Sequence, residues 1–223
     1  DIFAEIEKDP DKNWPHLKFV QWLDAHQLQE KLINEIKDEL KLGVDNSPAA
    51  FDESMGGTKY GDFAYFNIES AKKAEAWQIL SPVNNHGFGT REINRTIQQL
   101  YHQRNIELAS NPPDYTLGTY TRKRVRRIPE PVGLDNIVYG DKVINLRNTR
   151  WDKPWNYVYN PKKLTEMKYF ANGEIGLVVG QFRSNKFLKE HFTKPKDTRP
   201  KLFPPAVQIT FSSQPGYAYQ FRT

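Results

Sequence analysis

Apolar side chains in the first half of the chain recur with a helical period. Between Asp24 and Gly43 an apolar residue occupies every fourth position, at Leu28, Leu32, Ile36 and Leu40. This stripe predicts an amphipathic helix that Asp24 caps and Gly43 ends. A similar stripe predicts a second helix over about 90–104. Ser70 is predicted to cap a short helix between them.

A short apolar run precedes each of the two longer helices. LKFVQWL (17–23) and WQILSPV (77–83) both have the composition of a buried strand. Strand–helix–strand–helix order is how a parallel α/β sheet is built. Two strands make only half of such a sheet, so residues 1–110 are predicted to be a partial α/β domain. Residues 44–66 are expected to be a loop.

The pattern changes after residue 110. Residues 111–133 combine prolines with a basic run, which predicts a connector. From residue 134 to 223, short apolar segments are separated by glycine turns, a pattern typical of a small β-barrel or sandwich. The predicted fold is therefore α/β plus β.

The stretch FANGEIGLVVG (170–180) has two possible interpretations, a phosphate-binding loop or a turn between strands. A Walker-type loop needs Lys and then Ser or Thr after its glycines and must open a helix. Here β-branched residues follow Gly176 instead. Asn172-Gly173 suits a tight type I′ turn, so we predict a hairpin with Asn172, Gly173 and Glu174 at its tip. Glu174 is expected to be solvated there.

Charge is distributed unevenly along the chain. The net charge is +5, but residues 1–110 carry 12 basic and 18 acidic side chains, whereas residues 111–223 carry 20 and 9. A positive half joined to a negative half is typical of a polyanion-binding module attached to something else. A basic surface that is merely solvated is the alternative.

Two segments in the basic half could contact nucleic acid. One is the cationic run of the connector, which would release counterions from a phosphate backbone: Arg122, Lys123, Arg124, Arg126 and Arg127. A linker kept soluble by its charge is the alternative. The other is WDKPWNYVYNPKK, where aromatic residues such as Trp155 alternate with lysines. Its aromatics could stack on bases or pin a long loop onto the barrel, and both interpretations stay open.

The sequence offers no recognisable active site. It has no cysteine, and its five histidines lack metal-ligand spacing, so we expect no metal site. It has no kinase motif and no nucleophile elbow, so no catalytic residue is assigned. Asp141 is expected to form a turn. No apolar run is long enough for a membrane helix and the opening residues lack a signal peptide, which together with the missing cysteines favours the cytoplasm.

Four segments occur in the order found in a known family: WQILSPVNNHGFGTREINRTIQ, YGDKVINLRN, YFANGEIGLVVG and VQITFSSQPGYAYQF. They resemble the C-terminal part of RecD-like (UvrD-type, superfamily 1) DNA helicases, over roughly residues 50–223. The resemblance implies a partial RecA-like motor domain at 1–110, the connector at 111–133 and an inserted SH3-like β-barrel at 134–223. It also implies that the Walker A and B motifs lie outside this chain.

The resemblance further implies ATP-driven translocation on single-stranded DNA, in DNA repair or recombination. ATP and Mg²⁺ would serve the intact protein, with no cofactor in this chain, which should be inactive as an ATP hydrolase by itself. The remaining helicase domains and single-stranded DNA would be the partners. The family pattern implies DNA contacts at six residues near the second strand: Ser81, Pro82, Asn84, Gly89, Asn94 and Arg95. Relatives often place a basic residue where this chain has Asn84, which weakens a phosphate contact there.

Two other functions fit parts of the sequence. A KOW-type SH3-like barrel that binds RNA would also place a GDxV strand before a glycine turn, but such barrels rarely carry WQILSPV and an amphipathic helix. A protein-interaction module would use the incomplete sheet as its docking surface.

Overall fold

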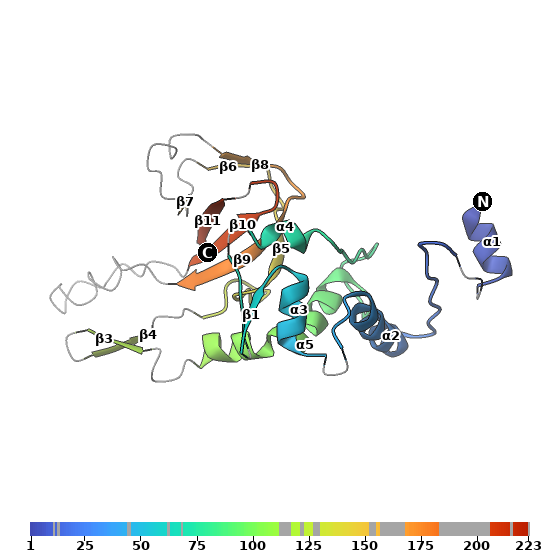
Figure 1. Cartoon of the computed structure of the whole chain (residues 1–223), viewed down its shortest axis with the longest axis horizontal. Coiled ribbons are helices and arrows are strands. Elements are labelled where there is room, and N and C mark those ends of the chain that lie inside the picture. The colour runs from blue at the N-terminus through green and yellow to red at the C-terminus, as the bar shows by residue number, and fades with distance from the viewer. Residues whose placement is uncertain are drawn as a thin grey trace.

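The computed structural model describes residues 1–10, 12, 14–43, 46–61, 63–67, 69–111, 117–120, 123–126, 130–151, 155–156, 168–182, 206–214 and 216–222. Within them the fold combines helices with antiparallel sheets (Figure 1). The coarse prediction of a mixed α and β protein is therefore confirmed. No helix in the described part is both long and apolar enough to span a membrane.

The helices of the described part lie in the first half of the chain. They are α1 (Ile2–Lys8), α2 (Ala25–Glu39), α3 (Pro48–Ser54), α4 (Ala71–Ala74) and α5 (Thr90–Ser110). The Asp24 carboxylate accepts a hydrogen bond from the Gln27 amide at 2.8 Å, so the predicted cap of α2 is confirmed. The predicted loop over 44–66 is wrong in part, because it contains α3 and a small hairpin of β1 (Thr58–Tyr60) and β2 (Phe63–Tyr65).

The two predicted parallel strands do not form a sheet in the described structure. Segments 17–23 and 77–83 have no ladder partner among the described residues. The prediction of a buried strand at 17–23 is wrong, because Leu23 is 89% exposed and three more of its apolar side chains are also exposed. Leu80 in the second segment is 87% exposed. Apolar composition predicted strands in these two segments, but a strand requires a neighbouring strand, which neither segment has among the described residues.

The described residues of the second half of the chain form β-strands and the turns between them, as predicted. One antiparallel sheet has the order β5-β9-β10-β11-β7. Its strands are β5 (Lys142–Ile144), β7 (Trp155–Asn156), β9 (Ile175–Phe182), β10 (Ala206–Phe211) and β11 (Tyr217–Arg222). The sheet does not close into a barrel within the described residues, and β6 (Thr149–Trp151) pairs separately with β8 (Lys168–Phe170).

The connector also contains β-structure. Strand β3 (Leu117–Tyr120) pairs with β4 (Lys123–Arg126) in an antiparallel hairpin. This hairpin lies beyond the C-terminal end of α5 in Figure 1. Residues 117–120 and 123–126 of the predicted connector are therefore strands, which the sequence did not predict.

Strand β9 separates two cores, because consecutive side chains of a strand point to opposite faces. Leu177 packs with the helices in a cluster that includes Phe51 of α3 and Tyr101 of α5. Val178 packs on the other side in a cluster rich in aromatic rings, including Phe170 and Tyr219. The sheet is thus covered by helices on one face and by its own strands and loops on the other.

Candidate nucleic-acid interface

The loop before α5 contains four of the six residues that the family resemblance singles out: Ser81, Pro82, Asn84 and Gly89. The Ser81 hydroxyl lies 2.9 Å from the Phe88 carbonyl oxygen and 3.1 Å from the Val83 carbonyl oxygen. The Asn84 side-chain oxygen accepts a hydrogen bond from the Thr90 hydroxyl at 3.1 Å. Ser81 and Asn84 therefore hold the loop closed.

Gly89 is buried at the N-cap of α5, where a side chain would not fit. A Cβ atom at Gly89 would lie 2.5 Å from the Asn85 carbonyl oxygen and 2.7 Å from that of Asn84. The Thr90 amide donates to the Val83 carbonyl at 3.0 Å, and the Arg91 amide donates to the Asn84 carbonyl at 3.3 Å. Because the loop uses these first amides of α5, they are not available to bind a phosphate.

The exposed polar surface lies beside this closed loop. Pro82 and Asn84 are exposed on the loop, and Asn94 and Arg95 are exposed on the first two turns of α5. Arg91 is also exposed and lies four residues before Arg95, so both cations lie on the same side of the helix. The six predicted residues thus lie around one loop–helix junction. Ser81 and Gly89 stabilise the loop itself, and the other four are exposed.

The predicted contacts in the basic half fall largely outside the described residues. Lys123, Arg124 and Arg126 lie in β4, where only the backbone is described. Arg122 and Arg127 lie outside the described residues. The backbone of Trp155 pairs with Ala218 of β11, and its side chain is not among those described. The DNA contacts assigned to these residues stay predictions.

The Asn172-Gly173 pair does not form the predicted hairpin. Strand β8 pairs with β6 and strand β9 pairs with β5, so residues 142–151 and 168–182 form one long antiparallel ribbon. Residues 171–174 lie opposite 145–148 as an irregularity within that ribbon. Only Gly173 has a positive φ, of 93°, whereas a type I′ turn needs two such residues.

Backbone and side-chain hydrogen bonds from both strands hold this irregularity in place. The Gly173 amide donates to the Asn145 carbonyl at 2.7 Å, and the Asn172 amide donates to the Asn148 side chain at 2.9 Å. The Glu174 carboxylate accepts from the Ala171 amide at 2.8 Å and from the Ser213 hydroxyl at 2.5 Å. The expectation that Glu174 is merely solvated is therefore wrong. The three residues shape a bend in a ribbon, not a hairpin tip.

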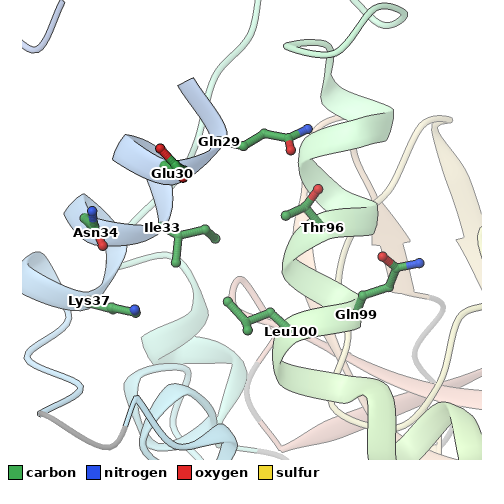
Figure 2. Close-up of a pocket in the computed structure, with 8 residues that line it drawn as sticks. All are labelled: Gln29, Glu30, Ile33, Asn34, Lys37, Thr96, Gln99 and Leu100. Atoms are coloured by element: carbon green, nitrogen blue, oxygen red, sulfur yellow. The ribbon is translucent and has the colours of Figure 1, made fainter. Parts of the chain in front are cut away.

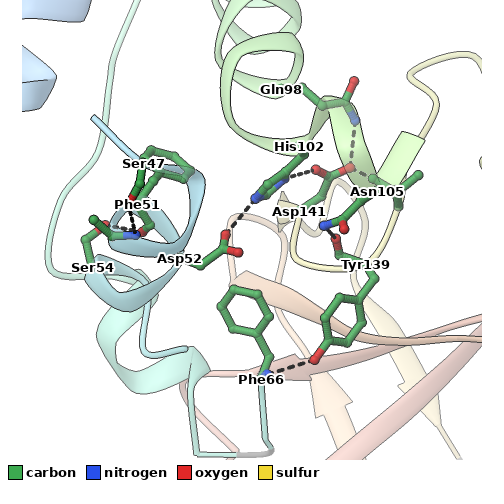
Figure 3. A network of polar contacts seen from close by, with 12 residues as sticks. Ser47, Phe51, Asp52, Ser54, Phe66, Gln98, His102, Asn105, Tyr139 and Asp141 are labelled. Atoms are coloured by element: carbon green, nitrogen blue, oxygen red, sulfur yellow. Dashed lines mark hydrogen bonds and ion pairs between the residues drawn. The ribbon is translucent and has the colours of Figure 1, made fainter. Parts of the chain in front are cut away.

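A buried polar cluster lies between the helices and the sheet (Figure 3). His102 of α5 is 3% exposed, and its two ring nitrogens lie 2.7 Å from Asp141 Oδ1 and 2.9 Å from Asp52 Oδ1. The second oxygen of Asp141 accepts from the Gln98 amide group at 2.7 Å and from the Val138 backbone amide at 2.9 Å. The cluster therefore joins α3, α5 and the entrance to β5 through side chains.

The two carboxylates determine the charge of His102. Burial alone would lower the pKa of His102, but its hydrogen bonds to Asp141 and Asp52 outweigh that effect and raise the pKa to about 9. His102 is therefore protonated at neutral pH and donates from both ring nitrogens. Burial raises the pKa of Asp52, and the hydrogen bond from His102 partly offsets this rise. The expected turn at Asp141 is confirmed by its bond to Val138, three residues earlier.

Lys142 follows this cluster at the start of β5. Its ammonium group donates to the Trp77 carbonyl oxygen and lies 4.4 Å from the centroid of the Trp77 ring. Burial lowers the pKa of Lys142 to about 8, against an opposing contribution from Glu75. The contact connects the segment before the candidate interface to the sheet, because Trp77 is the first residue of segment 77–83.

An open groove separates α2 from α5, with a volume of about 750 Å³ (Figure 2). Ile33 and Leu100 form its apolar part. Its other walls are polar: Gln29, Glu30, Asn34, Lys37, Thr96 and Gln99. The groove has no cluster of convergent charged groups, and the described residues contain no group of three or more His, Asp or Glu side chains placed to hold a metal ion.

Sequence reasoning missed the partners of His102. The signal available was weak: His102 and Asp52 each follow an aromatic core residue, Tyr101 and Phe51. Polar residues beside core positions are buried only when a partner satisfies them. That partnership spans distant parts of the chain and has no local sequence pattern.

Comparison with protein-family models, with curated proteins and with solved structures finds no match for this chain.

Proposed function

We propose that the chain is part of an ATP-dependent, RecD-like DNA helicase and contributes single-stranded DNA contacts and part of its second motor domain. The observation that carries this proposal is the arrangement of residues 77–95. An apolar segment leads into a closed loop and then into a 21-residue helix that exposes Arg91 and Arg95. In α/β proteins, ligands bind at the ends of strands where such loops enter helices.

The finer fold follows from the same proposal. Segments 17–23 and 77–83 would be strands of a RecA-like sheet whose neighbours come from the remaining helicase domains. Their exposed apolar side chains and missing ladder partners in the described part support this. The antiparallel strands from β5 onward would be the SH3-like insertion.

The described residues do not form a binding site for a nucleoside triphosphate at the start of α5. Loop carbonyls already accept from the first amides of α5, no Lys stands at that helix start, and the Thr90 hydroxyl there donates to the Asn84 side chain. ATP and Mg²⁺ would therefore be held elsewhere in the intact protein. We expect no ATP hydrolysis by this chain alone in a phosphate-release assay. Turnover that a substitution within residues 1–223 abolishes would contradict the proposal.

DNA binding is tested by fluorescence anisotropy with a labelled single-stranded oligonucleotide at several salt concentrations. If about four phosphates are neutralised, the log–log salt slope should be about −3, from roughly −0.7 per contact. Replacing Arg91 and Arg95 together by Ala should reduce the steepness of that slope by about 1.4. Lys73→Ala, which removes an exposed cation from α4, is the matched control and should leave the slope unchanged.

The cationic run is tested in the same assay. Replacing its five cations by Ala should flatten the slope further, whereas Trp155→Ala should weaken binding with little change in slope. A clear preference for RNA would favour the KOW-type alternative. Absence of binding at low salt would favour the protein-interaction module.

A further inference from the structure

The small β1–β2 hairpin presents aromatic rings to solvent on one face. Its register pairs Thr58 with Tyr65 and Tyr60 with Phe63, so these four side chains share a face. Tyr60 is 76% exposed, Tyr65 57% and Phe63 42%. The opposite face carries Ala64, which is buried against the body of the protein. The aromatic face is therefore the outward one.

The rings are arranged as separate surfaces and not as one packed core. The centroids of Tyr60 and Tyr65 are 6.1 Å apart, with the ring planes at 70°. The guanidinium carbon of Arg104, on α5, lies 3.9 Å from the centroid of Phe63. Arg104 is exposed, whereas Lys59 pairs with Ala64 and lies on the opposite face of the hairpin. Three aromatic surfaces thus lie beside one cation, Arg104.

We propose that this hairpin is a stacking platform for the unpaired bases of a single-stranded nucleic acid. Tyr60 and Tyr65 would each receive the face of a base, and Arg104 would contact the adjacent phosphate. Aromatic rings beside a cation are the combination that single-strand binders use, because every base has a π-face and the strand carries one charge per nucleotide. Exposed rings alone would fit many partners, and the Arg104 guanidinium beside Phe63 favours a polyanion.

This inference deepens the proposed function, since it rests on single-stranded DNA as the ligand and names the surface that holds its bases. It differs from the Arg91–Arg95 surface, where two cations make the proposed contact and the nearby rings of Trp22, His86 and Phe88 pack on one another. The two surfaces make separate predictions: the cations require phosphates and the hairpin requires bases.

The test compares two labelled 15-nucleotide probes on the full chain, one with normal bases and one with abasic sites throughout. The wild type should bind the normal probe at least about 30-fold more tightly, because stacking contributes roughly 1–3 kcal/mol for each of the two bases. Replacing Tyr60 and Tyr65 together by Ala should remove the share of that preference that these two rings contribute and leave affinity for the abasic probe unchanged. Replacement of both by Phe should restore the preference, because the ring remains.

Two further measurements locate the contact. A probe with 5-iododeoxyuridine, irradiated in the complex, should cross-link to the tryptic peptide that begins at Tyr60. Tyr169→Ala is the control, because Tyr169 is a half-exposed tyrosine on β8. It should change neither the preference nor the cross-link. Arg104→Gln should reduce the steepness of the salt slope by about 0.7.

The outcomes separate the inference from the proposed function. If the Ala double variant keeps the base preference, or the cross-link lies elsewhere while DNA still binds, the platform is wrong and the proposed function stands. If the wild type binds neither probe at low salt, both are wrong. Binding of a proline-rich peptide to the hairpin without any base preference would identify an aromatic peptide groove instead and would also overturn the platform.

Discussion

The two faces of β9 are packed by different chemistry. Leu177 faces a core in which helices surround a buried cluster of charged groups, with His102 between two carboxylates. Val178 faces a core of aliphatic and aromatic side chains in which the Phe170 and Tyr219 rings meet at right angles, 4.3 Å apart. Packing on the Leu177 face therefore depends on hydrogen bonds as well as on side-chain volume, whereas packing on the Val178 face depends mainly on side-chain volume.

This difference decides how each face responds to change. An apolar core loses stability in proportion to the atoms removed and depends little on pH. A buried ion cluster is most sensitive to the loss of one partner, because the remaining charges stay buried without compensation. The helical face should therefore be the pH-sensitive side of the sheet.

Removing His102 should have the largest effect. His102→Leu leaves Asp52 and Asp141 buried without their shared donor, and we expect a loss of about 3–5 kcal/mol in the free energy of unfolding at pH 6.5. Urea denaturation measures this loss. His26→Leu is the control, since His26 is exposed on α2 and should change stability by no more than about 0.5 kcal/mol. A loss below about 1 kcal/mol for His102→Leu would show that the cluster contributes little.

The apolar face should respond less strongly. Val178→Ala removes two fully buried methyl groups and leaves a cavity, which should cost about 2–3 kcal/mol. The same urea experiment at pH 6 and pH 9 should give equal losses for this variant. A loss that changes with pH would mean that the two faces are coupled through β9.

The pH dependence distinguishes the two faces directly. Because the pKa of His102 is raised from 6.5 to about 9 in the folded protein, its protonation stabilises the fold fully below pH 6.5. This contribution is lost as the pH rises through about 9. The stability difference between the wild type and His102→Leu should therefore narrow from pH 6.5 to 9.5 in thermal unfolding. A constant difference would contradict the raised pKa.

The bend in the ribbon should give the smallest effect. Gly173→Ala places a side chain at φ 93°, with no atom within 4 Å to clash, so only backbone strain of about 1–2 kcal/mol is expected. Asn172→Val should cost no more than about 0.5 kcal/mol, because Asn172 has no positive φ and is exposed. This bend lies between Phe170 and β9, and both contribute to the apolar core. The Gly173 variant therefore tests whether the stability of that core depends on the bend. Urea denaturation of both variants measures the difference.

Local features of the fold could be predicted from the sequence. The apolar residue at every fourth position and the Asp24 cap were enough to predict α2, because both act within one or two helical turns. The stripe of α5 was also visible, although the helix extends to Ser110, six residues beyond the predicted end. The β-rich second half followed from its period and its glycine turns.

Features that depend on distant residues could not be predicted. Asn172-Gly173 suits a hairpin turn and a bend in a ribbon equally well, and only pairing with residues 145–148 decides between them. Apolar runs at 17–23 and 77–83 indicated extended backbone but not whether neighbouring strands were present. At the candidate interface the exposed polar residues were predicted, whereas the internal role of Ser81 depends on the carbonyl oxygens that its hydroxyl contacts.

The Asp52–His102–Asp141 cluster also bears on the order in which the chain assembles. Its members are separated by 50 and 39 positions, so both loops must close before His102 meets its partners. While the chain is being synthesised, α5 is complete well before Asp141 leaves the ribosome. At that stage His102 would lack Asp141 and would still be in contact with water, so it would be protonated as a solvated histidine is. The two hydrogen bonds from His102 to Asp52 and Asp141 are therefore expected to form late. In a hydrogen-exchange experiment during refolding, the backbone amides of α5 near His102 should be the last of that helix to become protected.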